Sequence, residues 1–390
     1  MKRRDFIKTS ALASGALLLP DILRASANNL LAVEDKILIV IQWSGGNDGL
    51  NTVIPIKNDL YYQYRQKIGI RASDALVLNT DVGLHPKLLA LREMFDQGEL
   101  AILQNVGYPE PDRSHFRSMD IWQSASASDV YWSDGWIGRM LDAGFLPQDA
   151  LEIDDSLSLA LKGKNKKGLA IRDIQQAHQL VAIGNHMCDG AHDHDNVSYL
   201  RTTLREATSG IDYIYSQSNK KTSTAAYPLT EFGRQMKSTS ELIMSGCKTR
   251  VYYLTLGGFD THAGQPGTQN RLFQEYSQAI GALKSDLKKE NRWKDVAILT
   301  FSEFGRRVKE NAGRGTDHGT AGVSFVMGGS IKTPGLYGGM PKLDQLVDGD
   351  LVHEIDFRRM YATLLDDWMG VSSAKILSDN FLRIPLFVSK

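Results

Sequence analysis

Five stretches of the chain contain residues that could bind a metal ion or carry out catalysis. Each combines Asp or Glu with His, Ser or Arg, and each lies next to an apolar run. They are QWSGGNDGLNT (42–52), GYPEPDRSHF (107–116), GFDTHAG (258–264), SEFGRR (302–307) and GTDHGTAG (315–322). Carboxylate oxygens together with imidazole nitrogens suit zinc, manganese or iron better than calcium, which prefers oxygen ligands alone.

Gathering these stretches into one place would bring several negative charges together. Like charges at close range repel, and a buried carboxylate is tolerated when it is paired or coordinates a cation. A bound divalent cation would remove the conflict. The sequence therefore predicts a metal site, provided that the fold brings the five stretches to one edge.

Each stretch alone also has an ordinary structural explanation. Asp48 lies among glycines, where Asn and Asp commonly form turns. Asp260 with His262 could cap a helix, and His318 could be a hydrogen-bonded core residue. Ser114 precedes a predicted helix, where serine is a preferred N-cap. The joint pattern favours a shared site, because every stretch follows or borders a predicted strand.

The elements that would position these residues alternate between strands and helices. Predicted strands are apolar at successive positions, as in strands covered on both faces, and comprise 37–43, 100–106, 251–257, 296–301 and 323–329. Helical periodicity appears in 86–100 and 268–290. This alternation predicts an α/β protein with a mainly parallel central sheet between helices. Ligands bind such sheets at the carboxyl ends of the strands.

Residues 150–245 do not show this regular alternation of strands and helices. The segment 156–171 is typical of a hairpin around a basic turn, and 196–218 and 226–246 are typical of long helices. Since strand-like runs resume afterwards, we interpret the region as a helical insertion or cap, not a separate domain.

A second group of possible ligands lies inside this region, in GNHMCDGAHDHDN (184–196). Short spacing of His and Cys is typical of metal ligands. No predicted strand positions the segment, however, and tight sites need a preorganised shell, which favours an exposed polar loop. The two cysteines, Cys188 and Cys247, permit one disulfide or two free thiols.

The N-terminus has the pattern of an export signal. Its basic start precedes an apolar stretch too short to span a bilayer, and Arg3 and Arg4 with the following residues resemble a twin-arginine signal. A general secretory signal or an uncleaved anchor is the alternative. Cleavage after Ala27 would leave 28–390 as one α/β domain, which we expect to be periplasmic or otherwise exported by the twin-arginine translocase, without a membrane span.

Composition excludes other classes of protein. The 390 residues include 45 Lys and Arg against 45 Asp and Glu, so nothing indicates a nucleic-acid surface. No haem, iron–sulfur or dinucleotide motif appears, which argues against an exported redox protein.

Five motifs in order resemble an exported, sulfatase-like family of unknown function within the alkaline phosphatase superfamily. The motifs are SGGNDGLNT (44–52), the region from HP (85–86) to RSHFRSMDIW (113–122), GGFDTH (257–262), SEFGRR (302–307) and GTDHGTAG (315–322). The resemblance covers nearly all of residues 36–345. The resemblance implies two metal ions and a nucleophile at a helix N-terminus. It makes Ser114 the nucleophile, with the metal ligands Asp48, Asp260, His262, Glu303 and His318.

This chain departs from the superfamily pattern in ways that bear on both metal number and substrate. Phe304 stands where a histidine ligand is expected, and Asp260 and His262 are closer in sequence than usual. The motifs therefore allow either one or two bound metal ions. The C/S-x-P-x-R motif of formylglycine sulfatases matches neither cysteine nor Ser114. This favours a phosphatase or phosphodiesterase over a sulfatase.

Further residues are expected to support the site. Candidates for holding the transferred group are Arg113, Arg117 and Arg306, with surface ion pairing as the alternative. Residues expected to support the ligands are Asn47, His85, His115 and Asp317.

Two hypotheses follow. The first is a metal-dependent hydrolase of small-molecule or polymeric phosphate or sulfate esters, with a metal-activated serine. The second is an inactive metal-binding or scaffold protein of the same fold.

Overall fold

A central sheet forms where the apolar runs were predicted. The computed structural model describes residues 36–185 and 195–388, and Ile37–Lys390 make up one compact unit. Its main strands are β1 (Ile37–Ser44), β5 (Leu100–Gly107), β8 (Val251–Gly257), β9 (Val296–Phe301) and β10 (Gly322–Gly328). They lie in the order β5-β10-β9-β1-β8. All five predicted strands are confirmed, and the predicted export signal lies outside the described residues.

Strand direction explains how all five candidate stretches reach one edge. β1 is parallel to both β8 and β9, so their carboxyl ends lie together. β10 runs antiparallel to β5 and β9, which places its first residue beside the ends of those strands. The stretch before β10 therefore joins the stretches that follow the other strands.

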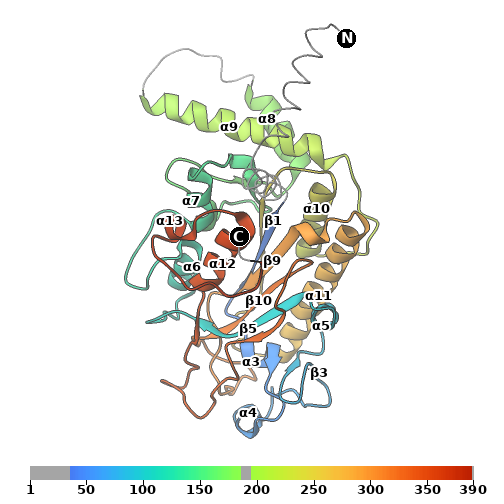
Figure 1. The fold of residues 1–390 in the computed structure, drawn as a ribbon, viewed down its shortest axis with the longest axis vertical. Coiled ribbons are helices and arrows are strands. Elements are labelled where there is room, and N and C mark those ends of the chain that lie inside the picture. The colour runs from blue at the N-terminus through green and yellow to red at the C-terminus, as the bar shows by residue number, and fades with distance from the viewer. Residues whose placement is uncertain (1–35, 186–194, 389–390) are drawn as a thin grey trace, which may run out of the picture. The chain divides into compact units, whose positions relative to one another are not determined.

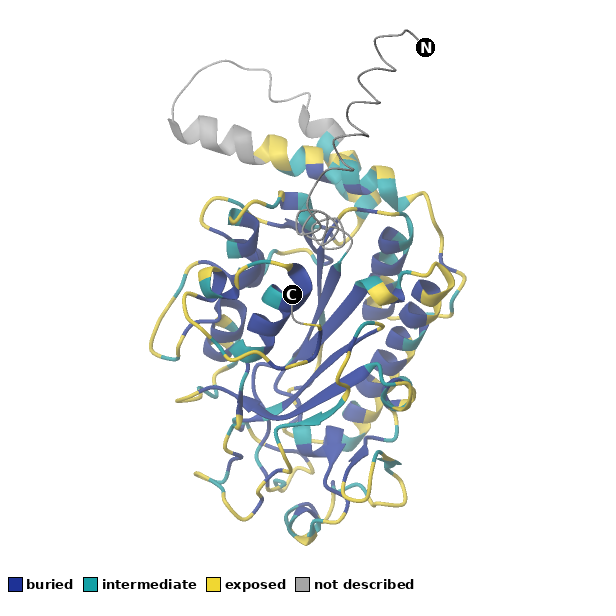
Figure 2. Cartoon of the chain, viewed as in Figure 1, coloured by how far each residue is buried: buried dark blue, intermediate teal, exposed yellow. Residues whose placement is uncertain are grey.

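Both faces of the sheet are covered by helices, as Figure 1 shows. One face packs against α5 (Leu89–Asp96), α10 (Glu231–Met244) and α11 (Gln265–Lys289). The other packs against α6 (His115–Ser124), α7 (Trp136–Asp142), α12 (Arg358–Thr363) and α13 (Ser373–Leu377). Alternate residues of β1 enter opposite cores, with Ile39 on one side and Val40 on the other. The five main strands are accordingly buried over most of their length (Figure 2), and the predicted α/β class is confirmed.

The region 150–245 extends the sheet as well as adding helices. β6 (Ala150–Glu152) pairs in parallel with β8, and β7 (Leu169–Ala170) pairs in parallel with β6. Instead of a two-strand hairpin, 156–171 contains a 3₁₀ turn, Leu159–Leu161, and a single antiparallel bridge between Lys162 and Lys167. The predicted hairpin around the basic turn is therefore present only as this bridge, with backbone hydrogen bonds from Gly163 to Lys166 and from Gly168 to Leu161, while β7 pairs with the main sheet.

The two long helices predicted in this region are confirmed. They are α9 (Asp195–Ser218) and α10, which follow α8 (Ile174–Asn185). α10 packs along α11 and covers the sheet directly. Most of the His-rich segment 184–196, including Cys188, lies outside the described residues. Cys247 is a buried free thiol whose sulfur lies 3.4 Å from Thr249 Oγ1.

Short elements surround the carboxyl edge of the sheet. After β1 come α3 (Gly49–Thr52) and α4 (Asp59–Tyr64), together with a small sheet of β2 (Val53–Ile54), β3 (Leu76–Val77) and β4 (Gly83–Leu84). β11 (Gly335–Tyr337) and β12 (Ile355–Asp356) add to the main sheet beside β5. A π-helical turn, Leu364–Met369, continues α12. In the described part of the chain, no helix is long and apolar enough to cross a bilayer.

His85 gives the fold a testable dependence on pH. Its backbone N–H donates to Thr52, its Nδ1 accepts from the Lys87 N–H at 3.1 Å, and its ring lies 4.8 Å from that of Phe273. Burial, and secondarily the charge of Lys87, lower the pKa of His85 from 6.5 to about 4. Between pH 6.5 and about 4 the His85 imidazole is protonated in the unfolded chain but not in the folded chain. The free energy of unfolding therefore falls as the pH drops through this window.

We expect His85→Gln to flatten this acid dependence. A shift of this size corresponds to roughly 3 kcal/mol, and the difference in unfolding free energy between wild type and variant should grow with pH by up to that amount. Urea unfolding at a series of pH values from 4 to 7 measures it. Parallel stability curves for the two proteins would contradict the assignment.

Candidate functional site

Four side chains converge at the carboxyl edge of the sheet. Asp260 and His262 follow β8, His318 precedes β10, and His115 begins α6. Asp260 Oδ1 lies 3.0 Å from His262 Nε2, 3.2 Å from His318 Nε2 and 3.6 Å from His115 Nε2. The Nε2 atoms of His262 and His318 are 3.0 Å apart. We call these four residues the imidazole cluster.

The other ring nitrogen of His318 and of His262 is held by an acceptor. His318 Nδ1 lies 2.9 Å from the carbonyl oxygen of Arg113, and His262 Nδ1 lies 3.1 Å from Asp317 Oδ1. Because a carbonyl oxygen only accepts, His318 Nδ1 must carry the proton. Without a cation, His318 Nε2 donates to Asp260 Oδ1 at 3.2 Å; with a cation bound, the lone pair of Nε2 would be its ligand atom. Asp317, expected to support a ligand, orients His262 in the same way.

His115 is held by Glu303, which is fully buried. Glu303 Oε1 accepts from His115 Nδ1 at 2.9 Å and from the Gly45 N–H at 2.8 Å, and Ser302 Oγ donates to Oε2 at 3.2 Å. The hydrogen bond to Glu303 is the main cause that raises the pKa of His115. His115 Nε2 is buried without a hydrogen-bond partner. Here the expected roles are exchanged: Glu303 orients, and His115 faces the cluster.

The cluster fits a divalent cation. Three imidazole Nε2 atoms lie within 3.6 Å of one carboxylate oxygen, and the ligand atoms of His115, Asp260 and His318 all lie within 4.8 Å of one another. Two ligands about 2.0 to 2.1 Å from tetrahedral zinc lie roughly 3.3 Å apart, close to the 3.0 to 3.6 Å found here. Holding each Nδ1 with an oxygen acceptor is the usual way to orient a metal-bound imidazole.

Arg306 holds Asp260 in place from behind. Its guanidinium donates to the carbonyls of Gly45, Gly46, Phe259 and Thr316 and to Asp260 Oδ1 at 2.6 Å. Burial alone would raise the pKa of Asp260, but hydrogen bonds from Arg306 and His318 outweigh it and hold that pKa at about 2. With its donors engaged inside the protein, Arg306 positions the strand-end loops and does not reach a substrate.

Arg113 and Arg117 are likewise engaged within the protein. The guanidinium of Arg113 pairs with Asp350. Arg117 donates to the carbonyls of Ala127, Ser128 and Val130 and lies over the ring of Tyr131. Arg117 thus has its guanidinium engaged within the fold, whereas a substrate-holding role of Arg113 stays a prediction, since its side chain is 37% exposed and its Nε has no hydrogen-bond partner.

Asp48 does not join the imidazole cluster. Its carboxylate is buried, accepting from Arg65 Nη1 at 2.5 Å and from Gln265. Asn47 donates through its amide to Thr52 Oγ1 at 2.9 Å and through its backbone to Ser302. Of the predicted metal ligands, the fold therefore gathers Asp260, His262 and His318.

Ser114 lies between two residues that build the cluster. The carbonyl of Arg113 orients His318, and His115 contributes its own ring. Ser114 is the N-cap residue of α6, but its side chain makes no capping hydrogen bond, and the residue is exposed. Its hydroxyl is thus not required to hold the helix.

Phe304 forms an apolar wall between the cluster and a neighbouring cavity. Its ring centroid lies 4.9 Å from that of His115 and 4.9 Å from that of His318. Gly46 has φ of +73°, and a Cβ there would lie 2.2 Å from the Phe304 ring, so this approach requires glycine.

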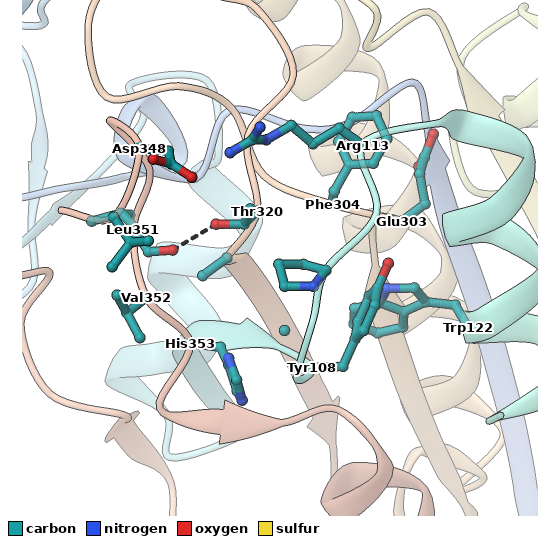
Figure 3. A pocket seen from close by; sticks show the side chains of 14 residues that line it. Tyr108, Arg113, Trp122, Glu303, Phe304, Thr320, Asp348, Leu351, Val352 and His353 are labelled. Carbon is teal, nitrogen blue, oxygen red and sulfur yellow. Dashed lines mark hydrogen bonds between the residues drawn. The ribbon is translucent and has the colours of Figure 1, made fainter. Parts of the chain in front are cut away.

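On its other side, Phe304 lines a cavity of about 370 Å³. Figure 3 shows Tyr108, Trp122, Leu351, Val352 and His353 around it. The lining is mostly apolar with a few polar groups, which is typical of a ligand pocket. Sequence reasoning missed this cavity, because its walls come from segments far apart in the chain.

The fold and the cluster together define an α/β protein with an imidazole–carboxylate site at the carboxyl edge of its sheet. Residues 35–378 match the model of a family described as protein of unknown function (DUF1501), and the chain belongs to this family. No curated protein matches the chain.

Solved structures with a similar fold include members of the alkaline phosphatase superfamily. The lipoteichoic acid synthase LtaP from Listeria monocytogenes is 9% identical, with a TM-score of 0.36 over 78% of this chain and 68% of that one. A superfamily protein from Vibrio parahaemolyticus is 10% identical, with a TM-score of 0.40 over 89% and 70%. The zinc complex of the periplasmic domain of EcEptC from Escherichia coli is 10% identical, with a TM-score of 0.34 over 75% and 72%. These values are too low to transfer an activity.

Proposed function

We propose that this protein is an exported hydrolase of phosphate or sulfate esters that holds a divalent cation in the imidazole cluster and uses Ser114 as its nucleophile. One observation carries the proposal. Three histidine Nε2 atoms lie within 3.6 Å of Asp260 Oδ1, each of these histidines is oriented by an oxygen at its Nδ1, and the exposed Ser114 directly precedes one of them, His115.

Each residue of the site has a separate task. A bound cation would supply Lewis acidity, lowering the pKa of the nucleophile and neutralising charge on the transferred group. Asp260, His262, His318 and His115 would hold it. Glu303, Asp317 and the Arg113 carbonyl fix the rings, and Arg306 fixes the loop that carries Asp260.

Ser114 would attack the phosphorus or sulfur atom. A bond forms between Ser114 Oγ and that atom as the bond to the leaving alcohol breaks, and the serine proton passes to solvent at this exposed edge. The alcohol leaves with a proton taken from water. A second water molecule then cleaves the seryl ester and restores the hydroxyl, releasing phosphate or sulfate from a monoester and a phosphate monoester from a phosphodiester.

The cavity beside Phe304 is where we place the organic part of the ester. Its aromatic and aliphatic walls suit an apolar or aromatic group, and Phe304 and Arg113 border both the cavity and the cluster. The twin-arginine-like N-terminus supports the proposal of export, and an exported enzyme would meet its substrate outside the cytoplasm.

Metal analysis combined with turnover of three probes tests the proposal. Freshly exported protein should contain zinc, manganese or iron and should hydrolyse at least one of an aryl phosphate, an aryl phosphodiester and an aryl sulfate. Removal of the metal by a chelator should abolish turnover, and adding it back should restore it. Metal-free exported protein without activity on any probe would contradict the proposal.

A second candidate function is supported by the Asp48–Arg65 pair and by Phe304. Arg65 occupies the carboxylate of Asp48, and Phe304 stands where a histidine ligand was expected, so two ligands of a two-metal site are lost. Such a loss is expected of an inactive metal-binding scaffold. Bound metal without turnover of any of the three probes would favour this function.

A further inference from the structure

The surroundings of Asp48 point to a specific number of bound ions. We infer that the protein binds one divalent cation, in the imidazole cluster, and that the guanidinium of Arg65 provides Asp48 with the positive charge that a second ion would otherwise supply. We further infer that this arrangement favours esters carrying a single negative charge. The inference rests on the proposed metal site, and its statement about ion number does not require catalysis.

Both oxygens of the Asp48 carboxylate already accept hydrogen bonds within the protein. Oδ2 accepts from Arg65 Nη1 at 2.5 Å and from Gln265 Nε2, and Oδ1 accepts from the Leu50 N–H at 3.2 Å. Asp48 and Arg65 are each only 1% exposed. A metal ion would have to displace these donors from a site that water does not reach.

Arg65 is fixed in this position by further hydrogen bonds. Its Nη1 also donates to Asn51 Oδ1 at 2.8 Å, its Nε to the Val308 carbonyl at 2.9 Å and its Nη2 to the Arg307 carbonyl at 3.0 Å. Arginine stays protonated at any pH of interest. Asp48 is therefore neutralised permanently by a built-in cation, and a metal ion beside it would be repelled by Arg65.

The other positions expected to complete a second site offer no ligand either. Both oxygens of Glu303 are occupied, Oε1 by Gly45 and His115 and Oε2 by Ser302. Phe304 has no donor atom, and its ring fills the space between Gly46 and the histidines. Asp48, Glu303 and Phe304 are thus all engaged within the fold.

Formal charge near the cluster then limits the substrate. Counting carboxylates as ionised, Asp260, Asp317 and Glu303 contribute three negative charges, and one divalent ion with Arg306 contributes three positive charges. No excess positive charge remains to attract a dianion, because Arg113 and Arg307, which both pair with Asp350, are balanced by Asp350 and Asp348. A phosphodiester or a sulfate monoester, each with one negative charge, matches this balance better than a phosphate monoester.

Metal stoichiometry decides the first part of the inference. Elemental analysis of the exported protein, and zinc titration of the chelated protein by calorimetry, should give about one ion per chain. Asp48→Asn should leave that value unchanged, whereas Asp260→Asn should bring it close to zero. Two ions per chain, or a loss of one ion in Asp48→Asn, would overturn the inference. Absence of any ion would overturn it together with the metal site.

A double-mutant comparison tests the role of Arg65 without metal or activity. Arg65→Met leaves a buried carboxylate unpaired and should lower the melting temperature more than the double variant Arg65→Met/Asp48→Asn does, since the double variant removes both charges. Equal melting temperatures would overturn the pairing. If Arg65→Met does not fold but the double variant does, the result equally shows that the unpaired Asp48 carboxylate destabilises the single variant.

Probe charge tests the second part. The ratio of kcat/KM for an aryl phosphodiester or sulfate to that for the matching aryl phosphate should exceed about tenfold, one decade per 1.4 kcal/mol of preference. A preference for the dianionic monoester would overturn this part. Lack of turnover on every probe would contradict catalysis and with it the substrate preference, while the ion count would still be decided by the metal measurement.

Discussion

Asp260→Asn is expected to remove the bound metal and the hydrolytic activity together. Asp260 Oδ1 is the atom on which all three histidine Nε2 atoms converge, so the substitution takes away the negative charge at the centre of the cluster. We expect metal affinity to fall by at least about 100-fold, since even residues that only orient ligands cost 10- to 100-fold. Elemental analysis and turnover of the preferred probe measure both losses.

The fold should survive this substitution. The side chain of Asp260 is 49% exposed, and asparagine keeps an oxygen that can accept from Arg306. Asp120→Asn, on the exposed side of α6, is a matched control that should retain metal and activity. Turnover by a metal-free Asp260→Asn protein would exclude the cluster as the catalytic centre.

The course of the main strands could be predicted because both faces are covered. Residues such as Ile39 and Val40 enter different cores, which gives β1 an unbroken apolar sequence. The sequence of β10 does not indicate that this strand runs antiparallel to its neighbours. A strand buried on both faces has the same apolar composition in either direction. The pairing of β7 with β6 was missed for a related reason, since two residues carry too little pattern to reveal a partner.

The candidate site could be predicted in part for the same physical reason. Asp260, His262 and His318 border predicted strands, and the ends of neighbouring strands meet at one edge. The sequence does not show which cation a carboxylate will meet. Asp48 also borders a strand, but its partner Arg65 comes from the turn after α4, and only the folded chain brings the two together.

The exchange between Glu303 and His115 has a similar origin. Both residue types are ordinary ligands, and their spacing from the strands fits either role. The Gly45 N–H and the Ser302 hydroxyl settle the matter by occupying Glu303, which leaves the Nε2 of His115 to face Asp260. Roles that depend on such tertiary hydrogen bonds are beyond a single sequence.

Ser114→Ala is expected to abolish turnover while leaving both metal and stability intact. If Ser114 forms the covalent ester, its removal should lower kcat by about a thousandfold or more, the range seen when a nucleophile is deleted. Metal content should not change, because the cluster contains no atom of the Ser114 side chain. Steady-state kinetics on the preferred probe, with elemental analysis of the same sample, measures both quantities.

The melting temperature separates this chemical role from a structural one. Ser114 precedes α6, and loss of a capping serine typically costs about 1 kcal/mol, but its side chain makes no capping bond here. An unchanged melting temperature with lost turnover therefore assigns the hydroxyl to the reaction. Ser216→Ala, which removes an exposed hydroxyl from α9, should change neither quantity. Acid-quenched wild-type protein should carry the transferred group on Ser114, detectable by mass spectrometry: phosphate or sulfate from a monoester, and phosphate with its remaining organic substituent from a phosphodiester. Full activity in Ser114→Ala would rule out the serine and leave direct attack by water as the route.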